Sequence, residues 1–256
     1  MAGEVRYDPV TGRPAPVVII CHSFMAFKNW GFFPHVAREI ARAGFCTVAF
    51  NFSLNGAEDS GNRITDFSKF ERNTISREID DLGRVTDAVS SNVWGIGAID
   101  PRRIVYLGHS RGGGIAITCA AAERRISGLV TWSSISTFDR WTAHQKALWK
   151  SSGSLPLARD TAASPLRMGS GFLEDLERNP GRSPAAAAPF VGAPWLILHG
   201  GADVTVSPRE AEVLYGAADR ARTDLVLLDG VGHLYHDATL DRVIDTTIHW
   251  LRRHIT

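Results

Sequence analysis

The 256-residue sequence lacks the features that mark several classes of protein. It contains no extended run of lysine and arginine, and its formal net charge is only +1, so we expect neither nucleic acid nor an anionic membrane as a partner. No window approaches the roughly eighteen consecutive apolar residues that a membrane span requires. The N-terminal stretch MAGEVRYDPV lacks a basic region followed by an apolar one, so we expect no secretory signal.

Cysteine is scarce as well, which bears on the redox compartment and on metal binding. The cysteines are Cys21, Cys46 and Cys119, which are far apart and lie in apolar or small-residue segments. Buried, reduced thiols are the usual state of such residues, so we expect a cytoplasmic protein without a disulfide framework. None of them has metal-ligand spacing, and no metal site is expected.

Short apolar runs recur along the chain. Apolar residues make up 44% of the sequence and charged residues 21%, as in an average soluble globular protein, and the length allows one substantial core. The runs are rich in Val, Ile and Leu and lack polar alternation, which is typical of strands covered on both faces. They span residues 17–21, 46–51, 104–107, 128–132, 195–199 and 225–228.

Helices are expected between these strands. Apolar residues or small residues at helical spacing predict helices over 33–43, 74–89, 111–122 and 240–251. Ser207-Pro208-Arg209-Glu210 predicts a capping box that opens another helix. This alternation predicts the α/β class, with a mostly parallel sheet and helices on both faces.

One long segment interrupts the alternation. Residues 134–194 contain no clear strand but three possible short helices, and structureless loops of this length are uncommon. We therefore expect an inserted cap or lid at 134–194, between a first core segment at 1–133 and a second at 195–256. The other long connection, 52–72, is expected to be a surface loop.

The clearest motif is Gly108-His109-Ser110-Arg111-Gly112, which matches G-x-S-x-G between an expected strand and an expected helix. A sharp turn of this kind holds a serine hydroxyl above the carboxyl end of the sheet, and the glycines remove side chains that would collide. The alternative is a glycine-rich turn that binds phosphate at a helix N-terminus. No Walker lysine or G-x-G-x-x-G pattern supports it, so we predict Ser110 as a nucleophile.

A serine nucleophile requires a base and an acid, which in this arrangement follow it in the order acid, then histidine. Asp203 lies in a turn beyond the strand at 195–199, and His233 follows a glycine-rich approach beyond the strand at 225–228. We predict that Asp203 orients His233, which takes the proton of the serine. Alternatives remain for both roles. Asp203 could form only an Asx turn, and the remaining rivals are His236, Asp139 and Asp229.

The negative oxygen that forms during attack needs N–H donors, each of which stabilises it by roughly 3–4 kcal/mol. We predict the backbone N–H groups of Arg111 and Phe24, with Ser23 as a near alternative to Phe24. His22, His109 and His199 also lie at strand ends, where hydrogen bonding within loops is the expected role.

Four ordered motifs carry a resemblance to a known family: His22-Ser23-Phe24, Gly108 to Gly113, His199 to Asp203, and Gly232-His233. Together they resemble the α/β-hydrolase superfamily, most closely bacterial esterases of the dienelactone-hydrolase, prolyl-oligopeptidase-like and cinnamoyl-esterase branches. The resemblance implies a mostly parallel sheet of about eight strands, no cofactor, and hydrolysis through an acyl-enzyme. Few residues precede the first expected strand, so we expect that edge of the sheet to be shortened.

Aromatic residues near the motifs bear on the substrate. Trp30, Trp132, Trp141 and Trp149 either line a substrate pocket or bury the cap against the sheet. We expect a monomer or homodimer acting on small-molecule carboxylic esters of small to medium acyl groups. A peptidase, amidase or thioesterase with the same three residues is the alternative, followed by a non-catalytic binding protein.

Overall fold

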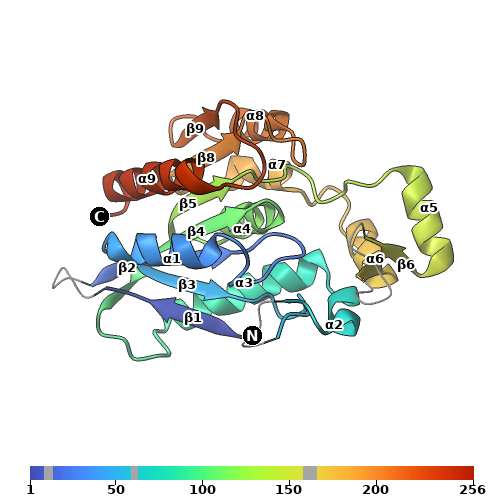
Figure 1. Ribbon diagram of the computed structural model, residues 1–256, viewed down its shortest axis with the longest axis horizontal. Coiled ribbons are helices and arrows are strands. Elements are labelled where there is room, and N and C mark those ends of the chain that lie inside the picture. Colours follow the sequence, from blue (N-terminus) through green and yellow to red (C-terminus); the bar gives the residue numbers. More distant parts are fainter. Residues whose placement is uncertain (9–13, 59–62, 158–165) are drawn as a thin grey trace.

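The computed structural model describes residues 1–8, 14–58, 63–157 and 166–256, and a mostly parallel sheet forms its centre (Figure 1). In the described residues this sheet has seven strands in the order β1-β3-β2-β4-β5-β8-β9. Only β1 runs antiparallel to its neighbour. The strands are β1 (Gly3–Arg6), β2 (Ala15–Cys21), β3 (Cys46–Phe50), β4 (Ile99–His109), β5 (Ile126–Trp132), β8 (Trp195–Gly200) and β9 (Thr223–Leu228).

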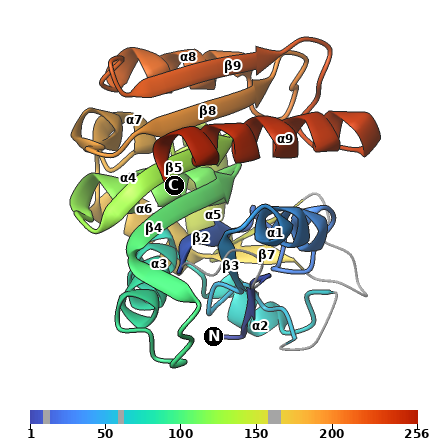
Figure 2. The same cartoon turned by 90° about the vertical axis from the view of Figure 1, so that its left-hand side faces the viewer.

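Each face of the sheet has its own hydrophobic core because successive side chains of a strand point to opposite faces. Along β2, Val17 and Ile19 belong to one core, and Val18 and Ile20 belong to the other. Two groups of helices cover these faces (Figure 2). The first face packs against α3 (Ile75–Ser90), α4 (Arg111–Ala122) and α8 (Pro208–Ala217), and the second against α1 (Phe33–Arg42) and α9 (Asp237–His254).

The chain order of the strands indicates which edge of the sheet would bind a ligand. From β2 the chain moves to β3 on one side, and β4 then returns to the other side of β2. In open α/β sheets, ligands bind outside the carboxyl ends of strands at such a reversal. Cys21 at the end of β2 pairs in register with Gly108 near the end of β4, so the two predicted site loops begin as neighbours.

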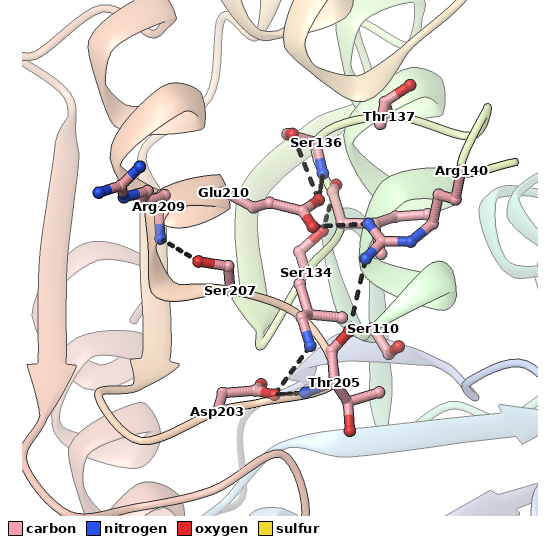
Figure 3. Close-up of polar contacts among 12 residues, drawn as sticks. Ser110, Ser134, Ser136, Thr137, Arg140, Asp203, Thr205, Ser207, Arg209 and Glu210 are labelled. Carbon is pink, nitrogen blue, oxygen red and sulfur yellow. Dashed lines mark hydrogen bonds and ion pairs between the residues drawn. The ribbon is translucent and has the colours of Figure 1, made fainter. Parts of the chain in front are cut away.

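The beginning of α8 differs from the sequence prediction. Ser207 is the N-cap and Pro208 occupies the first turn, as expected. The Glu210 carboxylate, however, does not complete a capping box, so that part of the prediction was wrong. It accepts a hydrogen bond from the Ser136 N–H at 2.7 Å and pairs with Arg140 at 2.6 Å (Figure 3). The Glu210 carboxylate therefore binds the Arg140 side chain and the Ser136 N–H instead of the N-terminus of its own helix.

The described residues between 134 and 194 form short helices and strands. These are α5 (Ala143–Ser152), a hairpin of β6 (Ser154–Pro156) and β7 (Arg167–Gly169), α6 (Ser170–Arg178), α7 (Pro184–Ala187) and a 3₁₀ turn at Ala188–Phe190. In Figure 1, α5, α6 and β6 lie to the right, beyond the sheet. The stretch expected to be a surface loop contains α2 (Phe67–Glu71), whose first turn is capped by the Asp66 side chain. The expectation of a surface loop at 52–72 was therefore wrong for residues 67–71, which form this helix.

Candidate active site

Ser110 occupies a strained turn between β4 and α4. Its φ of 56° and ψ of −121° lie in a region that side-chain-bearing residues rarely adopt. A Cβ atom on Gly108 would lie 2.4 Å from the carbonyl oxygen of Gly112, and one on Gly112 would lie 2.4 Å from the carbonyl oxygens of Cys21 and His22. The glycines of the motif therefore let the start of α4 lie directly against the ends of β2 and β4.

This close approach predicts the effect of one substitution. Gly112→Ala should lower the free energy of unfolding by about 2–3 kcal/mol, because the new Cβ would overlap backbone that cannot move aside cheaply. Urea unfolding measures the change. The matched control is Gly83→Ala in α3, where a Cβ would meet nothing within 4 Å. This variant should have an equal free energy of unfolding or one that is about 0.5–1 kcal/mol higher. Equal stability of the two variants would contradict the packing argument.

The structure brings Ser110, His233 and Asp203 together from three separate loops. The Nε2 atom of His233 lies 3.1 Å from the Ser110 Oγ, and its Nδ1 atom lies 2.7 Å from the Asp203 Oδ2. Ser110 is 8% exposed and Asp203 is 4% exposed. Because a carboxylate can only accept, it fixes the imidazole proton on Nδ1 and leaves Nε2 free to accept from the serine.

Asp203 has a second set of partners. Its Oδ1 accepts hydrogen bonds from the N–H groups of Thr205 at 2.9 Å and Val206 at 2.8 Å (Figure 3). The carboxylate thus forms the Asx turn considered as its alternative role and also faces His233. Burial alone would raise the pKa of this carboxyl, but hydrogen bonds from His199, His233 and the Val206 N–H hold its pKa well below the usual range. Asp203 is therefore ionised at neutral pH.

His109 holds the loop that carries His233. Its Nε2–H donates to the carbonyl oxygen of His233 at 3.0 Å, and the two rings lie 4.8 Å apart. Two residues further on, the buried Tyr235 hydroxyl lies 2.9 Å from the Ser133 Oγ at the end of β5. The sequence marked His109 only as a strand-end histidine, and its loop hydrogen bond agrees with that expectation. No sequence signal pointed to Tyr235.

Two buried histidines predict how stability changes with pH. Burial lowers the pKa of His22 to about 4 and that of His109 to about 3, so the fold favours their neutral forms. Between pH 6.5 and 4 the unfolded chain binds protons that the folded chain does not, and stability should fall as pH falls. Each histidine should contribute a slope of about 1.4 kcal/mol per pH unit.

His109→Gln isolates one of the two contributions, because the glutamine amide can still donate a hydrogen bond to the His233 carbonyl. Urea unfolding at pH 7, 6, 5 and 4 should show a slope shallower than that of the wild type by about 1.4 kcal/mol per pH unit. Superimposable slopes would show that His109 is already charged in the folded protein.

The rival site residues lie elsewhere. His236 is exposed and precedes α9, where its N–H donates to the Thr239 Oγ1 at 3.2 Å. Asp139 is exposed and pairs with Lys146. Asp229 is exposed at the end of β9. The structure thus places Asp203, rather than either of the other two aspartates, beside the imidazole of His233.

The loop after β2 is held by its own histidine. The Nδ1 of His22 lies 2.9 Å from the Ser23 carbonyl oxygen, and its Nε2 accepts from the Phe52 N–H at 3.3 Å. In the part of the chain that the structure describes, the N–H groups of Phe24 and Arg111 form no loop or turn hydrogen bond. Both groups are therefore available as donors, and the same holds for the Ser23 N–H.

The structure separates the tryptophans predicted for a pocket. Trp132 and Trp149 have no exposed surface, so the prediction that they line a pocket was wrong for both. Trp132 lies in the core and donates to the Thr247 Oγ1 at 3.1 Å. Trp30 and Trp141 are half-buried, and the nearest rings to Trp141 are those of Trp149 and Phe172. Hydropathy alone does not distinguish a ring that lines a pocket from one that fills a core.

Residues 1–8, 14–58, 63–157 and 166–256 contain neither a helix that could span a membrane nor a cluster of metal ligands. None of the helices there combines the length and the hydropathy needed to cross a bilayer. Within the same residues, no group of three or more His, Cys, Asp or Glu side chains is arranged to hold a metal ion.

Comparisons with known proteins agree with this architecture. An Escherichia coli protein described as an uncharacterized 31.7 kDa protein in the traX-finO intergenic region is 23% identical over 277 aligned residues, which cover 94% of this chain and 91% of that protein. The Paleococcus ferrophilus monoacylglycerol lipase structure superposes with a TM-score of 0.70 at 18% identity, covering 99% of this chain and 100% of that one. Est1E from Butyrivibrio proteoclasticus, with ferulic acid bound, gives 0.74 at 19% identity, covering 99% and 94%. A family model described as alpha/beta hydrolase fold matches residues 16–183, and the chain belongs to this family.

Proposed function

We propose that the protein is a serine hydrolase that cleaves carboxylic esters of small to medium acyl groups through an acyl-enzyme. The observation that carries this proposal is the unbroken hydrogen-bonded series from the Ser110 Oγ through His233 to the ionised Asp203. Similarity in fold to a monoacylglycerol lipase and to Est1E supports an ester as the substrate. Both are below 25% identity, so the reaction type rests on the site itself.

In the first half of the proposed reaction, the Ser110 Oγ attacks the carbonyl carbon of the ester and transfers its proton to the Nε2 of His233. The charged Asp203 stabilises the imidazolium that results. The tetrahedral intermediate then collapses, the bond to the leaving oxygen breaks, and His233 protonates that oxygen as the alcohol departs. Ser110 is left as an ester of the acyl group.

Water completes the reaction. It gives a proton to His233 as its oxygen attacks the acyl carbon, and the second tetrahedral intermediate releases the carboxylic acid. His233 returns the proton to Ser110. In both halves, the N–H groups of Phe24 and Arg111 stabilise the negative oxygen, and the N-terminus of α4 adds the favourable end of its dipole.

We also propose that 134–194 acts as a cap over this site, inserted between core segments 1–133 and 195–256. The segment leaves the sheet after β5 and returns at β8, its neighbour. One buried carboxylate joins it to the core, because the Asp175 Oδ2 accepts from the N–H of Ser76 at 2.8 Å and its Oδ1 from the Ser76 hydroxyl at 2.5 Å. Residues 158–165 of the proposed cap lie outside the described residues.

A matched substrate series tests the reaction class. The p-nitrophenyl ester, the thioester and the anilide of butyric acid share an acyl group and differ in the atom that leaves. We expect the highest kcat/KM for the ester and little or no cleavage of the anilide, whose leaving group is harder to expel. A kcat/KM for the anilide or the thioester that equals or exceeds that for the ester would overturn the esterase proposal in favour of an amidase or thioesterase.

A further inference from the structure

The side chain of Arg111 is enclosed by residues from other elements. Its Cζ lies 3.9 Å from the centre of the Phe24 ring and 5.8 Å from that of Phe172 in α6. Its Nη2 donates to the Glu78 Oε1 at 2.5 Å. The side chain of Arg111 is 11% exposed and that of Glu78 is 2% exposed. A guanidinium over a ring is attracted to its negative face, and removal from water strengthens the attraction.

The carboxylate partner is itself held in place. The amide of Asn73 donates to the same Oε1 of Glu78 at 2.7 Å. Glu78 lies on α3, which packs against the sheet. The ion pair therefore ties Arg111 to α3 and not to the loop after β2. Separating a buried ion pair leaves an unpaired buried charge, which strongly destabilises the fold. The pairing with Glu78 therefore keeps the Arg111 side chain in this one place.

The Phe24 ring contacts two other side chains. Its ring stacks on Phe70 with centroids 5.7 Å apart and an interplanar angle of 24°, and the Arg111 guanidinium covers it as well. The backbone N–H of Phe24 is one of the two donors in the proposed reaction. Because the ring and the N–H belong to the same residue, a fixed ring limits where this N–H can point.

We propose that the Arg111 guanidinium is a positioning group that fixes the Phe24 N–H as an oxyanion donor. We propose further that Phe172 makes this positioning depend on the placement of α6. This inference rests on the proposed function, and it assigns to the Arg111 side chain a role separate from that of its backbone N–H.

The link to α6 continues into the segment 134–194. The ring of Phe172 stacks on Trp149 with centroids 5.9 Å apart and meets Trp141 edge-on at 5.4 Å. A row of contacts thus runs from these tryptophans through Phe172 and Arg111 to Phe24. A shift of α6 would remove one of the two rings that enclose the guanidinium.

Three variants test the proposal: Phe24→Leu, Arg111→Lys and Phe172→Leu. Phe24→Leu keeps the N–H but removes the ring, and Arg111→Lys keeps the charge beside Glu78 but removes the flat guanidinium. Phe172→Leu removes the ring that α6 places near Arg111, together with the contacts of that ring to Trp141 and Trp149. Leu173→Ala, at a buried position beside Phe172 in α6, is the matched control for loss of packing.

The readouts are kcat and KM for p-nitrophenyl butyrate, the inhibition constant of a butylboronic acid, and the temperature of unfolding. The boronate adduct of Ser110 is tetrahedral and places an oxygen where the donors act, so its affinity reports donor placement without turnover. For Phe24→Leu and Arg111→Lys we expect kcat to fall about tenfold, KM to stay within about twofold, and the inhibition constant to rise in parallel. Phe172→Leu should show a smaller change in the same direction.

Leu173→Ala should lower the temperature of unfolding and leave kcat and the inhibition constant close to those of the wild type. Wild-type kcat and boronate affinity in Phe24→Leu and Arg111→Lys would overturn the positioning role while leaving the proposed function intact. An equal rise of the inhibition constant in Leu173→Ala would also overturn it, since general loosening would then explain the effect. A wild-type protein that cleaves no ester would overturn the proposed function and this inference together.

Discussion

Ser110→Ala is expected to lower the kcat for p-nitrophenyl butyrate by at least about 10,000-fold, because no other group can form the acyl-enzyme. The residual rate should come from the oxyanion donors and from binding alone. The temperature of unfolding should stay near that of the wild type, because the variant loses a single hydroxyl and its partner His233 keeps the hydrogen bond to Asp203. Initial rates and thermal unfolding, measured on the same preparation, check both parts.

The control for this variant is Ser134→Ala. Ser134 is also a buried serine, and its side chain lies beside Gly113, close to the turn that holds Ser110. Its hydroxyl, however, donates to the Ile135 carbonyl at 3.1 Å rather than facing His233. Its kcat should stay within a few-fold of the wild type. A Ser110→Ala protein that retains more than a few per cent of wild-type kcat would contradict the assignment of the nucleophile.

Asp203→Asn should have the second largest effect, a loss of about 10,000-fold in kcat. The amide has almost the same shape as the carboxylate but carries no charge. Its nitrogen can donate to the Nδ1 of His233 and so place the imidazole proton on Nε2, where it cannot accept from Ser110. The charge that stabilises the imidazolium is lost at the same time.

The pH dependence of kcat distinguishes this explanation from simple unfolding. Raising the pH should recover part of the activity of Asp203→Asn, because hydroxide can then remove the serine proton directly, whereas an unfolded variant would not recover. Asp229→Asn, at an exposed position at the end of β9, should behave as the wild type. If Asp229→Asn lost activity and Asp203→Asn kept it, Asp229 rather than Asp203 would be the carboxylate that orients His233.

The fold class could be predicted from the sequence because a parallel strand that is buried on both faces consists almost entirely of apolar residues. Val17 to Cys21 carry no polar residue, since alternate side chains enter two different cores. The same reasoning missed β1, the short Gly3–Arg6 strand. It is half-exposed at the sheet edge, so its sequence need not be apolar. The resemblance implied a sheet of about eight strands, and in the described residues the central sheet has seven.

The proximity of the three site residues could be predicted, because the sequence shows that each of them follows a strand of a parallel sheet. A serine between two glycines after a strand, and an aspartate and a histidine after two later strands, must meet where the carboxyl ends of parallel strands meet. The partners of Arg111 could not be predicted in this way. Glu78, Phe24 and Phe172 lie on three different elements, and only the packing of those elements brings them around one guanidinium.

The tryptophans show a second limit. Trp132 and Trp149 are large aromatic residues of the kind that often line pockets, yet both are wholly buried. The hairpin of β6 and β7 was also not expected, because three-residue strands are too short to show a periodic pattern. In both cases the outcome depends on contacts between distant segments, which a local pattern does not contain.

Mass mapping after reaction with a fluorophosphonate tests the central claim most directly, because this reagent forms a covalent bond only with an activated serine hydroxyl. One phosphonyl group per chain is expected, located on the peptide that contains Ser110, with labelling strongly slowed in His233→Ala and absent in Ser110→Ala. A protein that hydrolyses esters but carries the label on another residue, or takes up none, would contradict the account.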